Sequence, residues 1–180
     1  MSADITKKVA VSYGDITNLA LEAIVNASDE NLSGGGGVDR AIHQAAGIQL
    51  AQECRKIGRC PTGEAVITPG FNLPAKWVIH TAGPVWRGGK KGEDALLANC
   101  YKNALALAEA HGIKTVGFPA ISCGVFRFPA RRAAKIAMTQ AKEFLGHSKV
   151  VNGIGFVCFN EETWDVFRKA REKMFPEIHK

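Results

Sequence analysis

Four consecutive glycines at positions 34–37, closely followed by Asp39, form the stretch of this sequence with the clearest chemical potential. Glycine amides carry no side chain, so they can approach a ligand closely and adopt positive φ angles. An apolar run at 23–27 precedes the loop, and a helical pattern starts at Val38. Free amides at a helix N-terminus attract anions, because the positive end of the helix dipole points the same way. We therefore predict an anion-binding loop rather than a flexible linker or a plain tight turn.

The common phosphate-binding motifs do not fit this loop. In the dinucleotide-binding pattern G-x-G-x-x-G, counted from Gly34, the last glycine position holds Asp39. The P-loop is excluded because no Lys-Ser or Lys-Thr pair ends the glycine run. A phosphate cradle of another kind remains.

A second loop has the same surroundings, since it follows an apolar run at 115–121 and precedes a helical pattern that starts near Pro129. Parallel strands would bring both loops to one edge of a sheet, and two facing sets of amides suit a diphosphate better than a single phosphate. Arg131 and Arg132 lie in the first helical turn, where the helix dipole disfavours cations. They either face solvent or accompany a bound anion together with Arg127.

The elements that must position these loops alternate along the chain. Strand patterns cover residues 5–13, 23–27, 64–68, 77–81, 115–121 and 154–159, and helical patterns cover 38–47, 48–57, 93–112 and 129–145 and begin again at 160. This alternation predicts one three-layer α/β/α domain over residues 1–180, built around a mixed, largely parallel central sheet.

The composition fits such a domain, because 46% of the 180 residues are hydrophobic. The N-terminus does not resemble a signal peptide, and no apolar run approaches the ~20 residues that span a bilayer. Five cysteines are scattered without a Cys-x-x-Cys pair, so we expect no disulfide, no metal site and a reducing, cytoplasmic location.

The formal net charge of +6 permits attraction to polyanions without specifying one. The basic residues are spread along the chain, and no aromatic–basic interleaving supports a nucleic-acid partner. We expect no membrane association and a monomeric protein.

Several motifs, in this order and spacing, resemble those of the macrodomain family, specifically its MacroD-type branch, and the resemblance covers nearly the whole chain. The motifs are GDIT at 14–17, VNA at 25–27, GGGGVD at 34–39 with AIH at 41–43, CPTGEA at 60–65, HT-x-GPVW at 80–86 and FPAIS-x-GV at 118–125.

The resemblance implies ADP-ribose binding without a cofactor or metal ion. It also implies hydrolysis of esters at the distal ribose, namely deacetylation of O-acetyl-ADP-ribose and removal of mono-ADP-ribose from acidic side chains of proteins. Asp39 would act as the base or position the water. On this resemblance Asp15 accepts the adenine amino group, the Ile16 amide serves the adenine ring and Phe159 stacks on it. The other implied binding residues are Asn26, Gly36, Gly37, Val38, Ser122, Cys123, Gly124, Val125 and Phe126, the last packing on the distal ribose.

Local sequence offers another role for Asp15, as the N-cap of the short turn that follows it, and local evidence favours the cap. His43 shares a helical face with Asp39, and His80 ends a strand. We expect both histidines to be structural rather than catalytic.

Three positions depart from the family pattern. Asp29 stands where the family usually has an Asn that contacts the distal ribose near the scissile bond, so it joins Asp39 in the predicted catalytic set. Its charge should raise the pKa of one of the two carboxylates and weaken catalysis while binding is retained. Arg127 replaces a usual glycine and either offsets Asp29 or faces solvent. Cys123 replaces a usual threonine, a mild change if the loop works through backbone amides and not through a reactive thiol.

Three functions stay open at this point: an ADP-ribosyl-ester hydrolase, an ADP-ribose reader disabled by Asp29, and a binder of RNA or poly(ADP-ribose) that uses the positive charge. We favour the hydrolase, because Asp39 and both loops are present.

Overall fold

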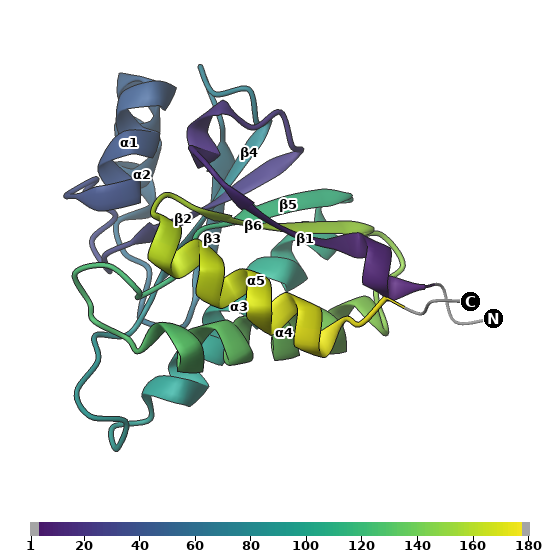
Figure 1. The fold of residues 1–180 in the computed structure, drawn as a ribbon. Coiled ribbons are helices and arrows are strands. Elements are labelled where there is room, and N and C mark those ends of the chain that lie inside the picture. Colours follow the sequence, from purple (N-terminus) through teal and green to yellow (C-terminus); the bar gives the residue numbers. More distant parts are fainter. Residues whose placement is uncertain (1–3, 178–180) are drawn as a thin grey trace.

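Six strands and five α-helices are distributed along residues 4–177, the part of the chain that the computed structural model describes (Figure 1). The strands are β1 (Val9–Tyr13), β2 (Ala23–Ser28), β3 (Ala65–Pro69), β4 (Trp77–Ala82), β5 (Thr115–Phe118) and β6 (Gly153–Cys158). The helices are α1 (Gly37–Ala46), α2 (Ile48–Ile57), α3 (Glu93–Ala110), α4 (Ala130–Leu145) and α5 (Glu161–Met174), with 3₁₀ turns η1 (Ile5–Lys8) and η2 (Ile16–Asn18).

The strands form one sheet in the order β1-β6-β5-β2-β4-β3. β3 runs antiparallel to β4, and the other neighbouring pairs are parallel. In Figure 1, α1 and α2 lie above the sheet, and α3, α4 and α5 lie below it. The predicted three-layer α/β/α architecture with a mixed, largely parallel sheet is confirmed.

The sheet opens between its two middle strands. β2 pairs with β4 along its whole length, up to Ser28 opposite Ala82. With β5, however, β2 pairs only at Ala23 and Ile24. The carboxyl ends of β2 and β5 therefore separate, and strand order changes direction at this point, which is where α/β sheets place their ligands.

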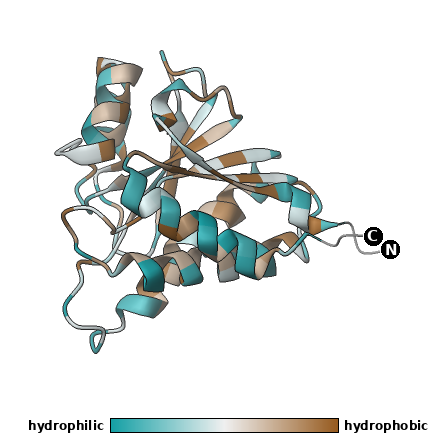
Figure 2. Ribbon diagram, viewed as in Figure 1, coloured by the Kyte–Doolittle hydropathy of each residue, from teal (hydrophilic) through white to brown (hydrophobic). Residues whose placement is uncertain are grey.

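Two hydrophobic clusters, one on each face, hold the layers together. Below the sheet, the rings of Phe118 and Phe156 stack 5.7 Å apart, with Tyr101 beside both. Above the sheet, Ile42 of α1 and Leu50 of α2 are fully buried. Figure 2 shows the same division, with hydrophobic strands inside and hydrophilic stripes on the outer faces of the helices.

Several predicted strand boundaries differ from the observed ones. Residues 5–8 form η1 instead of extending β1, because the Asp4 carboxylate accepts the Thr6 amide and caps that turn. β5 ends at Phe118, and the following Pro119 has no amide hydrogen to continue a ladder. β6 ends at Cys158 and leaves Phe159 free to project.

Candidate functional site

A cavity of about 470 Å³ lies at the carboxyl edge of the sheet, where β2 and β5 separate. This volume is typical of small-molecule sites. The ends of three strands form its floor, and the two loops that the sequence singled out form its sides. The floor residues are Ala27, Ser28, Pro119, Ala120, Val157 and Cys158.

The first loop connects β2 to α1 and is tied back by its own side chains. The Asp29 carboxylate accepts the Ser33 amide at 3.1 Å and also contacts the Ser33 hydroxyl. Gly34 and Gly37 adopt positive φ angles of 72° and 60°. Gly36, the residue before α1, provides no side-chain cap. The first amides of α1 therefore stay free at the cavity.

Hydrogen bonds between backbone groups hold the second loop, residues 122–128. The Phe128 amide donates to the Ser122 carbonyl at 2.9 Å, and the Trp86 amide donates to the Phe126 carbonyl at 2.8 Å. Ser122 and Arg127 adopt positive φ angles of 64° and 58° without being glycine. These two positive φ angles could not be predicted from the residue types, because serine and arginine rarely take that conformation.

Three amides of this second loop have no acceptor within residues 4–177, namely those of Gly124, Val125 and Phe126. All three residues line the cavity, opposite the N-terminus of α1. The cavity therefore presents two sets of unpaired backbone donors, one from each loop.

Asp39 lies in the first turn of α1, lines the cavity and is only 3% exposed. Its Oδ1 accepts the Asn26 amide nitrogen at 2.7 Å, and its Oδ2 accepts the Gly35 amide at 3.2 Å. His43 Nε2 stands 3.5 Å from Oδ1.

The pKa of Asp39 is raised above its ordinary value, and burial is the largest cause. The charge of Asp29 adds to the rise, while the hydrogen bond from Asn26 is the strongest opposing effect. The expectation that one carboxylate of this pair has a raised pKa is confirmed, although burial contributes more than the neighbouring charge.

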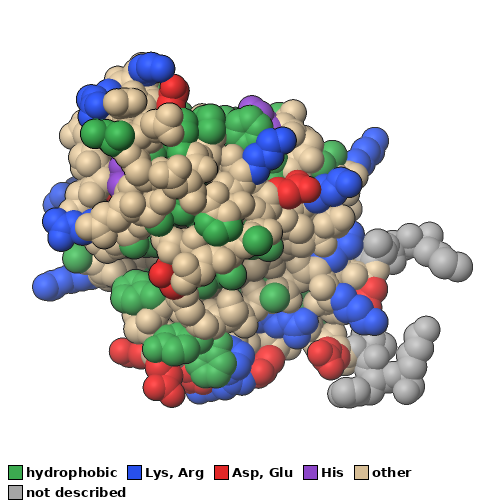
Figure 3. Space-filling model, turned by 90° about the horizontal axis from the view of Figure 1, so that it is seen from above, with side chains coloured by type: hydrophobic (Ala, Val, Ile, Leu, Met, Phe, Trp, Pro, Cys, Tyr) green, Lys and Arg blue, Asp and Glu red, His purple; other side chains and the backbone are tan. Residues whose placement is uncertain are grey.

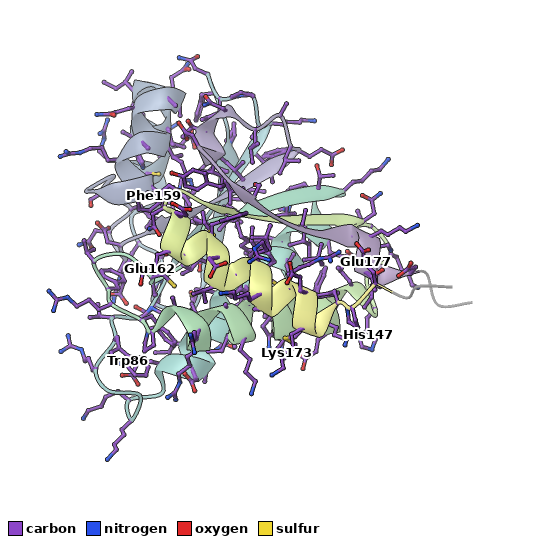
Figure 4. The ribbon with its side chains drawn as sticks, viewed as in Figure 1. Trp86, His147, Phe159, Glu162, Lys173 and Glu177 are labelled. Carbon is purple, nitrogen blue, oxygen red and sulfur yellow. The ribbon has the colours of Figure 1, made fainter. Side chains whose placement is uncertain are left out.

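Most of the predicted site residues meet in this cavity. Those that line it are Asp29, Gly36, Gly37, Val38, Asp39, Ser122, Cys123, Gly124, Val125, Phe126 and Phe159. Phe159 is 69% exposed at the end of β6, just before α5, where a flat ring could stack on it (Figure 4).

Three predicted binding residues do not line the cavity. Asn26 is fully buried beneath the cavity, where its side chain is hydrogen-bonded to Asp39 and His80 and does not reach the lining. Ile16 is 4% exposed. Asp15 caps η2 by accepting the Thr17 amide at 2.9 Å, as the local sequence favoured, and lies past the end of β1 on the same edge of the sheet.

Two of the sequence departures have plain structural outcomes. Burial raises the pKa of the Cys123 thiol to about 12, which opposes formation of a reactive thiolate there. Arg127 is exposed and does not line the cavity. Arg132 pairs with Asp94 at 2.6 Å and lies over the Trp86 ring, so its charge at the start of α4 is balanced without a bound anion.

The positive charge is dispersed on the face that Figure 3 shows, where Lys and Arg side chains are spread around the outline instead of forming one patch. Within residues 4–177, no three metal-ligating side chains gather in a suitable group. In the same range, no helix has the length and hydrophobicity needed to cross a membrane.

Sequence reasoning missed two features of the site. Gly83, at the end of β4, also lines the cavity, and a Cβ placed on it would overlap the Ser122 hydroxyl. His80, treated as structural, lies one hydrogen bond from Asn26 and two from Asp39. Only the register between β2 and β4 could have revealed that His80 lies next to Asn26.

The chain is similar to known proteins in sequence and in structure. The Macro domain family model matches residues 25–137, which include both loops. A protein of Escherichia fergusonii named O-acetyl-ADP-ribose deacetylase is 49% identical over 166 residues, covering 90% of this chain and 94% of that protein.

Among solved structures, a mutant macrodomain of Oceanobacillus iheyensis with ADPR matches with a TM-score of 0.88 and 37% identity, over 93% of each chain. A Trypanosoma brucei macrodomain in complex with ADP-ribose matches with a TM-score of 0.86 and 38% identity, over 94% of this chain and 72% of that one.

Proposed function

The chain belongs to the Macro domain family, and from this premise we propose that it binds ADP-ribose in the cavity and hydrolyses ester bonds at the distal ribose. The substrates would be O-acetyl-ADP-ribose and proteins that carry mono-ADP-ribose on acidic side chains. The deacetylase name of the Escherichia fergusonii relative supports the first of these.

The observation that carries the proposal is the pair of facing donor sets. The free amides at the start of α1 and those of Gly124, Val125 and Phe126 line one cavity. A diphosphate bound between them would receive hydrogen bonds from both sides, and the dipole of α1 would add to the attraction. The exposed ring of Phe159 would serve the adenine base, and Phe126 the distal ribose.

Asp39 would supply the chemistry. Ester hydrolysis needs a water molecule that loses a proton as it attacks the carbonyl, and a base works best when its pKa approaches the working pH. The helix dipole alone would lower the pKa of a carboxylate in the first turn of α1. Burial outweighs that effect here and raises it, which makes Asp39 a better base than an exposed aspartate.

Asn26 would support Asp39 instead of contacting the ligand, because its side-chain amide donates to the Asp39 carboxylate from below the cavity floor. Asp15 and Ile16 would meet the adenine only where it extends past the enclosed cavity toward β1, since neither residue lines it.

An ADP-ribose reader without turnover is the second candidate. The observation that favours it is the Asp29 carboxylate in the cavity wall, where it adds negative charge beside Asp39 and a bound diphosphate. The hydrogen bonds that it accepts from Ser33 hold this carboxylate in place in the wall.

Calorimetric titration with ADP-ribose and a chromatographic assay of O-acetyl-ADP-ribose separate these functions. For the hydrolase, the wild-type chain binds ADP-ribose and turns over the ester, and Asp39→Ala loses turnover by about 10²-fold or more. Binding without turnover identifies the reader. Absence of ADP-ribose binding contradicts both, and steeply salt-dependent binding of RNA instead would favour a polyanion binder.

A further inference from the structure

A row of three buried polar side chains crosses the sheet beneath Asp39. Asn26 on β2 and His80 on β4 are fully buried, and Thr68 on β3 is 2% exposed. The register places Asn26 opposite His80, and His80 opposite Val66. Because side chains alternate along a strand, Thr68 shares the face of Val66. All three side chains therefore lie on the face that α1 and α2 cover.

Hydrogen bonds link this row into a chain that ends on Asp39. The Asn26 Nδ2 stands 2.7 Å from Asp39 Oδ1 and 3.1 Å from His80 Nδ1, and His80 Nε2 stands 2.9 Å from the Thr68 hydroxyl oxygen. An amide nitrogen only donates, so its two hydrogens serve Asp39 and His80 Nδ1. The imidazole proton is then on Nε2 and is donated to Thr68.

The imidazole of His80 is neutral, because burial lowers its pKa to about 3. Neutral His80 can accept from Asn26 and donate to Thr68 at once, which a doubly protonated ring could not do. Donation thus runs from Asn26 to Asp39 on one side and from Asn26 through His80 to Thr68 on the other, and this fixes the Asn26 amide with its nitrogen toward Asp39.

Stability alone does not explain this row. Each buried polar group without a partner costs about 1–3 kcal/mol, and the Asn26 carbonyl oxygen has no partner within residues 4–177. Apolar side chains of similar size would fill the same space without that cost. What the polar row provides is a fixed donor for one oxygen of Asp39.

We propose that Asn26, His80 and Thr68 are positioning residues that hold the Asp39 carboxylate in its working orientation. The inference rests on the proposed hydrolysis. Asn26 holds Oδ1 and leaves Oδ2 beside Gly35, which lines the cavity, so a water molecule would meet the carboxylate from one side only. His80 acts through Asn26, and Thr68 acts through His80.

Asp39 also has titratable neighbours that do not belong to the row. His43 of α1, Cys54 of α2 and Asp29 of the first loop all influence it or are influenced by it. The pKa of the Cys54 thiol is raised to about 11, mainly by burial, so the thiol stays uncharged near neutral pH. The variants below leave His43 and Asp29 in place, so any change reports on the row.

Two variants of His80 test the proposal. His80→Leu removes the acceptor for Asn26, and we expect kcat for O-acetyl-ADP-ribose to fall about tenfold while the Kd for ADP-ribose stays within twofold. The acidic limb of the pH profile should move to higher pH, because a loosened Asn26 stabilises the charged Asp39 less. His80→Asn offers a carbonyl oxygen near the Nδ1 position, and we expect it to recover most of the loss.

Thr81→Val is the matched control. Thr81 follows His80 on β4, faces the other side of the sheet and donates its buried hydroxyl to the Glu64 carbonyl at 2.7 Å. Its loss should lower the unfolding midpoint without moving kcat or the pH profile. If His80→Leu behaves like Thr81→Val, or if His80→Asn recovers nothing, the row is structural and the proposal is wrong.

A readout without turnover separates this inference from the proposed function. NMR titration of the Asp39 carboxyl carbon should give a higher pKa in His80→Leu than in wild type. If wild type binds ADP-ribose but lacks turnover, the hydrolase proposal fails and the titration still tests the row. If His80→Leu does not fold, Thr68→Val takes its place with a smaller expected change of about twofold, and an unchanged titration there overturns the proposal.

Discussion

The two loops that face each other across the cavity solve one problem in different ways. Both expose backbone amides and both need residues at positive φ. In the first loop Gly34 and Gly37 adopt these angles, whereas in the second loop Ser122 and Arg127 adopt them with side chains attached. An L-residue in that conformation costs about 1–2 kcal/mol relative to its ordinary one. The second loop therefore depends more on its surroundings.

Those surroundings differ as well. Carboxylates of Asp29 and Asp39 tie the first loop from within. The second loop is held by backbone hydrogen bonds and packs closely against Gly83, whose missing side chain leaves room for Ser122. We therefore expect the first loop to respond to changes in side-chain charge and the second loop to changes in side-chain volume.

We expect the largest effect, on both stability and ADP-ribose binding, from filling the space beneath the second loop. In Gly83→Ala the new Cβ would overlap the Ser122 hydroxyl and lie 2.7 Å from Ile121 Cγ2. We expect the free energy of unfolding to fall by about 1–3 kcal/mol. The Kd for ADP-ribose should rise about tenfold, as measured by urea titration and calorimetry. Gly155→Ala, where a Cβ meets nothing within 4 Å, is the control and should change neither quantity.

The charge sensitivity of the first loop should appear in the pH dependence of stability. The folded-state pKa of Asp39 is raised, so its contribution is full below the unfolded pKa and is lost as the pH rises through the folded one. Each pKa unit corresponds to about 1.4 kcal/mol. Melting curves should show that wild type loses stability over this acidic window relative to Asp39→Asn. Parallel pH profiles for the two proteins would contradict the raised pKa.

A smaller effect should follow from relieving the backbone of the second loop. Arg127→Gly removes the left-handed strain but adds freedom to the unfolded chain, so we expect a net gain of about 0.5 kcal/mol in the free energy of unfolding. Arg131→Gly, in the first turn of α4, should instead lose up to about 1 kcal/mol. A loss of stability in Arg127→Gly, measured by chemical denaturation, would contradict the backbone strain assigned to Arg127.

The smallest expected effect concerns Asp29. In Asp29→Asn the negative charge beside the bound diphosphate is lost, and we expect turnover of O-acetyl-ADP-ribose to rise by about two- to fivefold even though the pKa of Asp39 falls slightly. Asp165→Asn, on α5 but outside the cavity lining, supplies the control. A turnover unchanged by Asp29→Asn would mean that the Asp29 charge does not limit catalysis.

The sequence predicted the fold and the first loop well, because their signals are local. Alternating strands and helices, and glycines before an amphipathic helix, are visible in consecutive residues. The Asp15 cap was also predictable, since the residues it joins are neighbours.

The buried row could not be predicted in this way. Asn26, Thr68 and His80 come together only through the register of three strands, one of them antiparallel. The positive φ angles of Ser122 and Arg127 could not be predicted for another reason. Hydrogen bonds and the packing against Gly83 override the local conformational preference of these residues. The boundary of β5 was wrong because an apolar run continues past Phe118 into the cavity floor.

The opening between β2 and β5 has a mechanical consequence. Only the pairs at Ala23 and Ile24 join one half of the sheet to the other along this seam. A ligand in the cavity would contact the ends of β2, β5 and β6 at once, so it would hold the two halves of the sheet together at this opening. Deuterium uptake by the amides of residues 25–28 would then slow on binding and report occupancy without any label on the ligand.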